Sequence, residues 1–107
     1  KKMYSNVYLN NPILYKGQRN GEDMELIMNI ESNLFLCETV VGSKKAKMLG
    51  SITKLNNETY QCTPIYAIQP FPETEEEWVE ASSEETKVVD LSKAEITLEK
   101  ATLTRQN

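Results

Sequence analysis

Residues 13–30 read ILYKGQRNGEDMELIMNI, and this stretch decides the fold. The pair Asn20-Gly21 stands between two apolar runs and favours a type I′ turn, because both central positions of that turn need a positive φ. After the turn, apolar residues occur at every second position: Met24, Leu26, Met28 and Ile30. Alternate residues of a strand point to one face, so we predict a hairpin whose second strand buries these four side chains together.

Further strands are expected on both sides of this hairpin. Segments rich in β-forming residues occur at 6–10, 34–41, 48–53 and 59–68, with polar turns between them. Strands that recur every 10 to 12 residues are typical of an antiparallel sandwich or barrel. The sequence therefore predicts an all-β fold, a small antiparallel barrel.

The C-terminal third permits two interpretations. Residues 86–90 suit a short strand. In 91–103, the β-branched residues Ile96, Thr97 and Thr102 favour another strand. The same segment also places Leu91, Ala94, Leu98 and Ala101 at helical spacing after a possible Ser92 cap. We expect the strand and keep the helix as the alternative.

Charge divides the chain of 107 residues into two parts. Residues 1–72 carry eight basic and six acidic side chains (net +2), and residues 73–107 carry four and ten (net −6), which together give the total of −4. The division follows Pro70-Phe71-Pro72. We therefore expect a β-barrel core at 1–72, followed at 73–107 by an acidic linker and C-terminal arm with a possible extra strand.

The composition excludes several kinds of chemistry. The chain has no histidine and only two cysteines, which removes imidazole catalysis, His-ligated metals and four-cysteine zinc sites. Its four glycines form neither a dinucleotide fingerprint nor a phosphate loop. No apolar run approaches the roughly 18 residues that a membrane span needs. The sequence predicts a protein that is not an enzyme, holds no cofactor or metal and does not span a membrane.

Two small features leave alternatives open. Lys44, Lys45 and Lys47 form a basic turn that could clamp a nucleic-acid backbone, or simply keep a hairpin tip soluble. The acidic net charge favours at most weak or indirect contact with nucleic acid. Cys37 and Cys62 are either buried free thiols or, in a secreted two-cysteine sandwich, a disulfide.

The segment from Leu14 to Glu73 resembles a known family. The elements that carry the resemblance are LYK at 14–16, MELIMNIESNLFL at 24–36, MLGSIT at 48–53 and TYQCTPIYAIQPF at 59–71, followed by acidic residues. In this order they resemble the N-terminal dimerisation domain of the larger subunit of the TFIIF-like heterodimer of RNA polymerase I. The related subunits of TFIIF and RNA polymerase III share the last element.

This resemblance implies half of a triple-barrel heterodimer, completed by strands from a second β-barrel subunit. It also implies a non-catalytic dimerisation module of a transcription complex, bound to a larger polymerase assembly in the nucleus or nucleolus. Strand 60–68 is apolar on both faces near its end, so we expect Tyr66, Ile68 and Phe71 to contact the partner, with Trp78 as an anchor in the acidic arm. The alternatives are an independent small β-barrel that binds a ligand or a host protein, of the viral accessory type, and the secreted sandwich.

Overall fold

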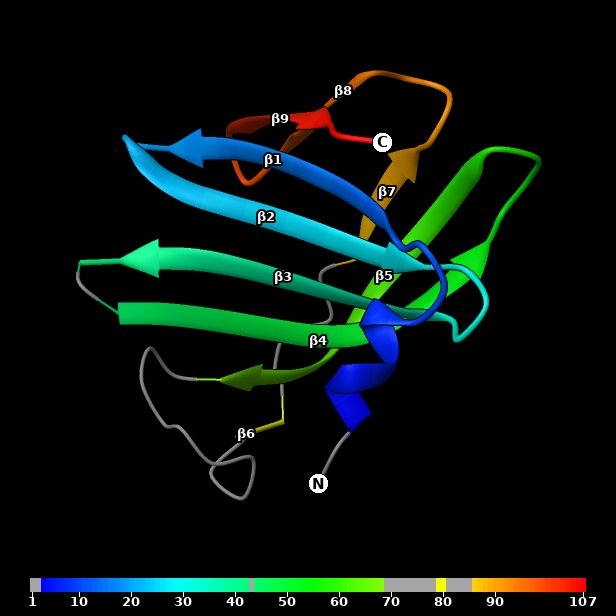
Figure 1. The fold of residues 1–107 in the computed structure, drawn as a ribbon, viewed down its shortest axis with the longest axis horizontal. Coiled ribbons are helices and arrows are strands. Elements are labelled where there is room, and N and C mark those ends of the chain that lie inside the picture. Colours follow the sequence, from blue (N-terminus) through cyan, green and yellow to red (C-terminus); the bar gives the residue numbers. More distant parts are fainter. Residues whose placement is uncertain (1–2, 43, 69–78, 81–85) are drawn as a thin grey trace.

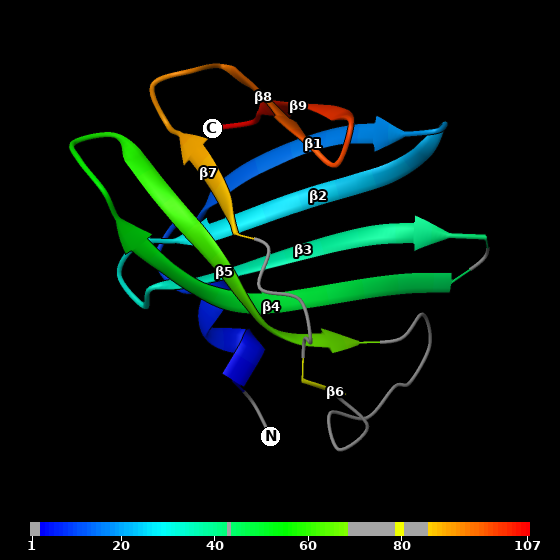
Figure 2. The same cartoon turned by 180° about the vertical axis from the view of Figure 1, so that it is seen from behind.

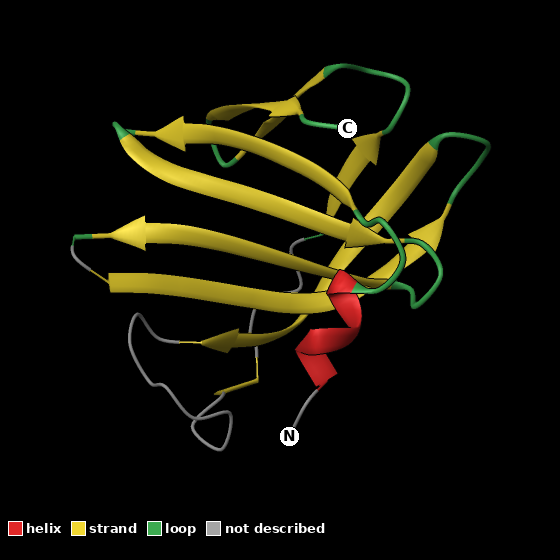
Figure 3. Cartoon of the chain, viewed as in Figure 1, coloured by secondary structure: helices red, strands yellow, loops and turns green. Residues whose placement is uncertain are grey.

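The protein is seen here in a computed structural model that describes residues 3–42, 44–68, 79–80 and 86–107. Within these ranges, one 3₁₀ helix precedes nine strands (Figures 1 and 3). In chain order they are η1 (Met3–Tyr8), β1 (Ile13–Arg19), β2 (Glu22–Asn29), β3 (Leu34–Val41), β4 (Lys44–Lys54), β5 (Thr59–Ile68), β6 (Val79–Glu80), β7 (Lys87–Asp90), β8 (Glu95–Leu98) and β9 (Ala101–Arg105).

Eight of the strands form a nearly closed antiparallel barrel. Strands β1 to β5 pair in sequence order, β7 pairs with β5, β9 pairs with β1 and β8 pairs with β9 (Figures 1 and 2). The two-residue β6 pairs with the end of β5. Within the described ranges, β7 and β8 share no strand ladder, so they form a seam in the barrel. The all-β barrel that the sequence predicts is confirmed.

Two of the hairpins with two-residue connections have different turn chemistry. Asn20 and Gly21 have φ values of 54° and 81°, which confirms the predicted turn between β1 and β2. The hairpin between β8 and β9 turns at Glu99 and Lys100, with φ values of 54° and 69°, although neither residue type favours this region. This turn separates two strands, so the helical alternative for 91–103 is wrong.

The inner face of the barrel holds the main core. Met24, Leu26 and Met28 are all buried there, as the alternation predicts. Ile30 does not join them, because β2 ends at Asn29 and Ile30 lies in the following turn with 37% of its surface exposed. Alternation along a sequence cannot indicate the residue at which a strand stops.

A second, smaller core lies on the outer face, beneath η1. Its buried members are Val7, Ile27, Leu36 and Leu49. The expected strand at 6–10 is wrong: the chain forms η1 there, and Asn10 and Asn11 then turn it through positive φ values of 51° and 56°. Val7 of this helix packs against apolar residues on the outer face of β2, β3 and β4 and so shields them from water.

The last three strands are part of the same core and sheet as the first five. Val89, Leu98 and Leu103 are buried in the inner core with residues of β1 and β2. The core therefore extends beyond the expected range of 1–72. Most of the acidic stretch, at 73–78 and 81–85, lies outside the described residues.

A close approach of backbones joins β1 to β9. Gly17 lies opposite Leu103, and a Cβ atom at position 17 would overlap the carbonyl oxygen of Thr102. A side chain there would push the two strands apart. Gly17 therefore permits the pairing that joins β8 and β9 to the first five strands.

Candidate functional site

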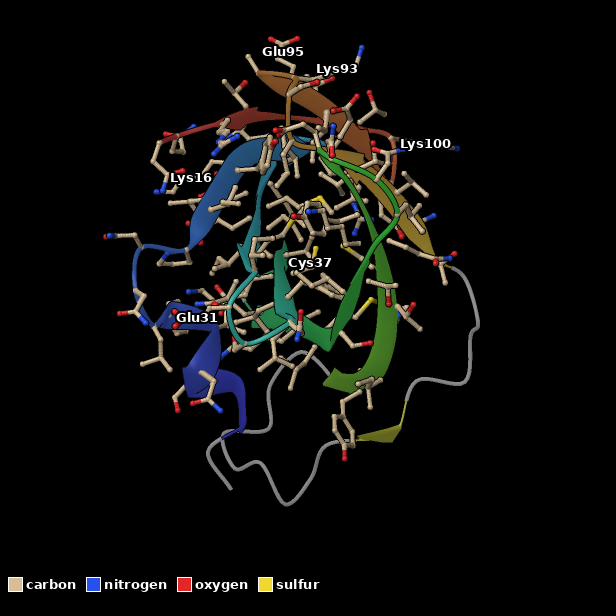
Figure 4. The ribbon with its side chains drawn as sticks, turned by 90° about the vertical axis from the view of Figure 1, so that its right-hand side faces the viewer. Lys16, Glu31, Cys37, Lys93, Glu95 and Lys100 are labelled. Carbon is tan, nitrogen blue, oxygen red and sulfur yellow. The ribbon has the colours of Figure 1, made fainter. Side chains whose placement is uncertain are left out.

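The barrel encloses a cavity of about 300 Å³. Its walls are mostly apolar and include Met24, Leu26, Phe35, Met48, Val89 and Leu98. Each of these side chains points inward because alternate residues of its strand face the interior. Figure 4 shows side chains from all sides converging inside the barrel, with the labelled Cys37 among them.

One end of the barrel is packed and the other is hollow. At the packed end, Tyr15, Met28 and Leu103 are fully buried. The Tyr15 hydroxyl donates a hydrogen bond to the Lys93 carbonyl (3.3 Å), and this bond ties β1 to the loop between β7 and β8. At the hollow end, which we call the mouth, the inward positions of β3, β4 and β5 carry small residues: Thr39, Ala46 and Ala67. The cavity exists because these side chains are too short to fill it.

Three charged side chains lie at the mouth, and we call them the mouth triad. Arg19 is the last residue of β1, Lys87 is the first of β7, and Glu99 lies in the turn between β8 and β9. The Arg19 Nη1 atom is 3.6 Å from Glu99 Oε1, and the Lys87 Nζ atom is 3.9 Å from Glu99 Oε2. All three line the cavity, so two cations and one carboxylate flank its entrance.

Two free thiols also face the cavity. Cys37 lies on β3 and Cys62 on β5, with β4 between them, and both are unoxidised. Burial raises the pKa of each thiol to about 12. Both groups therefore stay protonated near neutral pH, where they add to the apolar wall and are poor nucleophiles.

Tyr66 packs within its own chain. It lies opposite Leu49 and packs against the outer core, whose members include Val7 and Leu36. The neighbouring Ile65 occupies a register irregularity between β4 and β5 and is 38% exposed. The two faces of this strand thus meet two cores of the same chain, and the predicted contact of Tyr66 with a partner stays a prediction.

The other expected interface residues are less informative. Ile68 is the final residue of β5 and lies opposite Lys47. Phe71 and Trp78 lie outside the described residues. Of the four expected interface residues, Tyr66 is the one whose side-chain packing the structure describes.

The basic turn lies within a surface of mixed charge. Lys44 begins β4 and is opposite Val41. Lys45 borders a small hollow that it shares with acidic residues: Asp23, Glu25 and Glu38. The Lys47 Nζ atom is 3.6 Å from Glu38 Oε2. Acidic side chains thus lie beside Lys45 and Lys47 and offset part of their charge.

The mouth triad was not among the residues expected from the sequence. Arg19 precedes a turn, and Lys87 and Glu99 belong to the segment interpreted as an arm. One feature of the sequence could have indicated Arg19: it ends a strand on which it falls on the same, inward-facing side as Tyr15. The meeting of these residues depends on the pairing of β9 with β1, which no local pattern reveals.

Comparison with models of protein families, with curated proteins and with solved structures returns no match. The resemblance to a TFIIF-like subunit therefore stays a prediction. Among the described residues, no group of three or more cysteine, aspartate and glutamate side chains is arranged to hold a metal ion. Within the same ranges, no helix has the length and apolar character needed to cross a membrane.

Proposed function

We propose that the protein is a non-catalytic binding barrel that holds a small, largely apolar molecule in its cavity. The observation that carries this proposal is the cavity itself, with apolar walls, a packed end and a mouth of short side chains. Its volume of about 300 Å³ is at the lower end of the range typical of ligand sites, roughly 300–1,000 Å³. Eight-stranded barrels have interiors that suit either side-chain packing or one small ligand.

Energetics also favour an occupant. Protein interiors are close-packed, and residual cavities destabilise by about 24 cal/mol per Å³. For a closed void of about 300 Å³ that rate corresponds to on the order of 7 kcal/mol, an upper bound because the mouth opens to solvent. This is comparable with the whole stability of a small domain, about 5–15 kcal/mol. A bound apolar molecule would remove much of that cost.

The size of the cavity sets the size of the ligand. An apolar protein cavity of about 150 Å³ accommodates benzene. The present cavity therefore suits one aromatic ring with a short chain, or a molecule of similar bulk. 3-Phenylpropanamide is a neutral, soluble probe of this size.

The test is titration of ¹⁵N-labelled protein with 3-phenylpropanamide, followed by amide chemical shifts. We expect saturable shifts at cavity residues such as Cys37 and Ala46, with a Kd of about 1 mM or tighter. Ala46→Phe fills the mouth and should abolish these shifts. Val88→Phe is the matched control, because Val88 is 59% exposed. No saturable binding, or equal binding by both variants, would refute the proposal.

A second candidate is the dimerisation module of a transcription complex that the resemblance implies. The observation that favours it is the seam: within the described ranges, the facing edges of β7 and β8 have no ladder partner. Exposed strand edges accept strands from other chains. Analytical ultracentrifugation of the lone chain tests this, since an obligate half-barrel should self-associate. A stable monomer that binds the probe would favour the binding barrel.

A further inference from the structure

The charges at the mouth bear on which kind of molecule the cavity takes. Arg19 and Lys87 both lie near the carboxylate of Glu99, and these three side chains together carry a formal charge of +1. The third cation that borders the cavity, Lys47, is paired with Glu38 and is not counted. Among the described residues that line the cavity, the charged side chains at its rim thus have an excess of positive charge.

The geometry of the mouth triad leaves room for a second acceptor. The two nitrogen–oxygen distances, 3.6 Å and 3.9 Å, exceed those of hydrogen bonds, about 2.7–3.2 Å. Arg19 has five N–H donors in a planar fork that suits a carboxylate held by two bonds. Its Nη1 atom lies 3.6 Å from one oxygen of Glu99, which is longer than a hydrogen bond. A ligand carboxylate could take up closer bonds with this side chain.

The triad is partly shielded from water. The side chains of Arg19, Lys87 and Glu99 are 33%, 37% and 40% exposed. Their charges also reach the cavity wall: burial is the main cause of the raised pKa of Cys37, and Glu99 and Arg19 act on the same thiol in opposite directions. A charge at the entrance therefore interacts with these groups more strongly than it would in bulk water.

We propose that the ligand is amphipathic, with an apolar body in the cavity and a carboxylate or similar anionic group at the mouth held by Arg19 and Lys87. This inference rests on the proposed function, because it requires the cavity to be a binding site. It adds the chemical class of the ligand and the orientation in which it enters. Glu99 competes with the ligand for the two cations and so limits the affinity.

The test compares three probes that share one apolar body: 3-phenylpropanoate, 3-phenylpropanamide and 3-phenylpropylamine. We expect the carboxylate to bind about three- to tenfold more tightly than the amide, as for a partly exposed ion pair, and the amine to bind most weakly. Added salt should weaken binding of the carboxylate and leave binding of the amide unchanged. This salt comparison needs no variant and does not depend on how variants fold.

Variants then assign the preference to residues. Arg19→Gln and Lys87→Gln should each lower the ratio of carboxylate to amide affinity, whereas Glu99→Gln should raise it. Lys16→Gln is the matched control: Lys16 points away from the barrel, pairs with Glu25 at 3.5 Å and should not affect the ratio (Figure 4).

The outcomes separate the two proposals. Equal binding of the carboxylate and the amide, tighter binding of the amine, or an unchanged ratio in Glu99→Gln would overturn the anionic ligand and leave the binding barrel standing. If none of the three probes binds, the proposed function itself fails. Preference for the carboxylate that shifts with the triad variants supports both.

Discussion

Replacing Asn29 by alanine should detach the N-terminal helix from the barrel. Asn29 is 2% exposed and lies at the end of β2, beneath η1. Its Nδ2 atom donates hydrogen bonds to the carbonyls of Val7 (3.1 Å) and Leu9, and its Oδ1 atom accepts one from the Ser32 N–H (2.9 Å). One buried amide thus joins three backbone groups of two separate segments.

The expected loss follows from these three bonds. Each contributes roughly 0.5–1.5 kcal/mol net, so Asn29→Ala should lower the free energy of unfolding by about 2–4 kcal/mol. Asn29→Asp should be at least as damaging, because a carboxylate cannot donate and would face two carbonyl oxygens in a buried place. Urea denaturation measures the loss, provided that the m-value stays constant.

Two controls make this prediction sharp. Asn57→Ala removes the same side chain from an exposed turn and should change stability by less than about 0.5 kcal/mol. Hydrogen exchange should show faster exchange beneath η1, at Ile27 and Leu36, in Asn29→Ala only. If the two alanine variants lose equal stability, or if exchange rises uniformly over the barrel, the buried amide does not hold η1 in place.

Three other changes test the fold. Leu26→Ala should cost about 2–5 kcal/mol in urea denaturation and Glu25→Ala less than about 0.5 kcal/mol, because only the first side chain is buried in the inner core. Lys100→Gly should raise stability by about 1 kcal/mol in thermal denaturation, since φ is 69° there and glycine tolerates this region; a lower Tm would contradict the strained turn. The pKa of both thiols is raised from 9.0 to about 12 in the folded protein. Their contribution to the free energy of unfolding is therefore complete below pH 9 and is lost between pH 9 and 12, because the thiols of the unfolded chain ionise first. Cys37→Ala combined with Cys62→Ala should flatten this fall in stability with pH, and an unchanged slope would contradict it.

The parts of the fold that the sequence predicts are those that depend on neighbours along the chain. Asn20-Gly21 specifies its turn through two φ values, and the alternation from Met24 to Met28 specifies a strand with a buried face. Both statements need only a few adjacent residues.

The segment at 6–10 illustrates the limit of such reasoning. Val7 and Leu9 alternate with polar residues as a strand requires, yet Val7 is buried by a helical turn that the Asn29 amide holds in place. The deciding contact joins residues 22 positions apart. The local pattern is compatible with either structure, and tertiary packing selects one.

The candidate site was beyond prediction for the same reason. A cavity is a volume left unfilled, and it depends on which inward side chains share a level of the barrel. Ala46 and Ala67 are unremarkable in the sequence, and Arg19 and Lys87 are far apart in it. The apolar faces of 60–68 predict a partner chain, and that contact stays a prediction; within the chain, Tyr66 packs against the outer core beneath η1.

The pairing of β9 with β1 has a consequence for the order of folding. Hairpins from β1 to β5 join neighbouring segments, whereas Tyr15 lies opposite Arg105, 90 positions later (105 − 15). Contacts of high sequence separation carry a larger loop-closure entropy and form slowly. We therefore expect the meander of β1 to β5 to form early and the pairing of β9 with β1 to form last; Gly17 lies in that ladder, where the two backbones approach closely. The cavity has no far wall until that step, so the chain acquires the capacity to bind only at the end of folding.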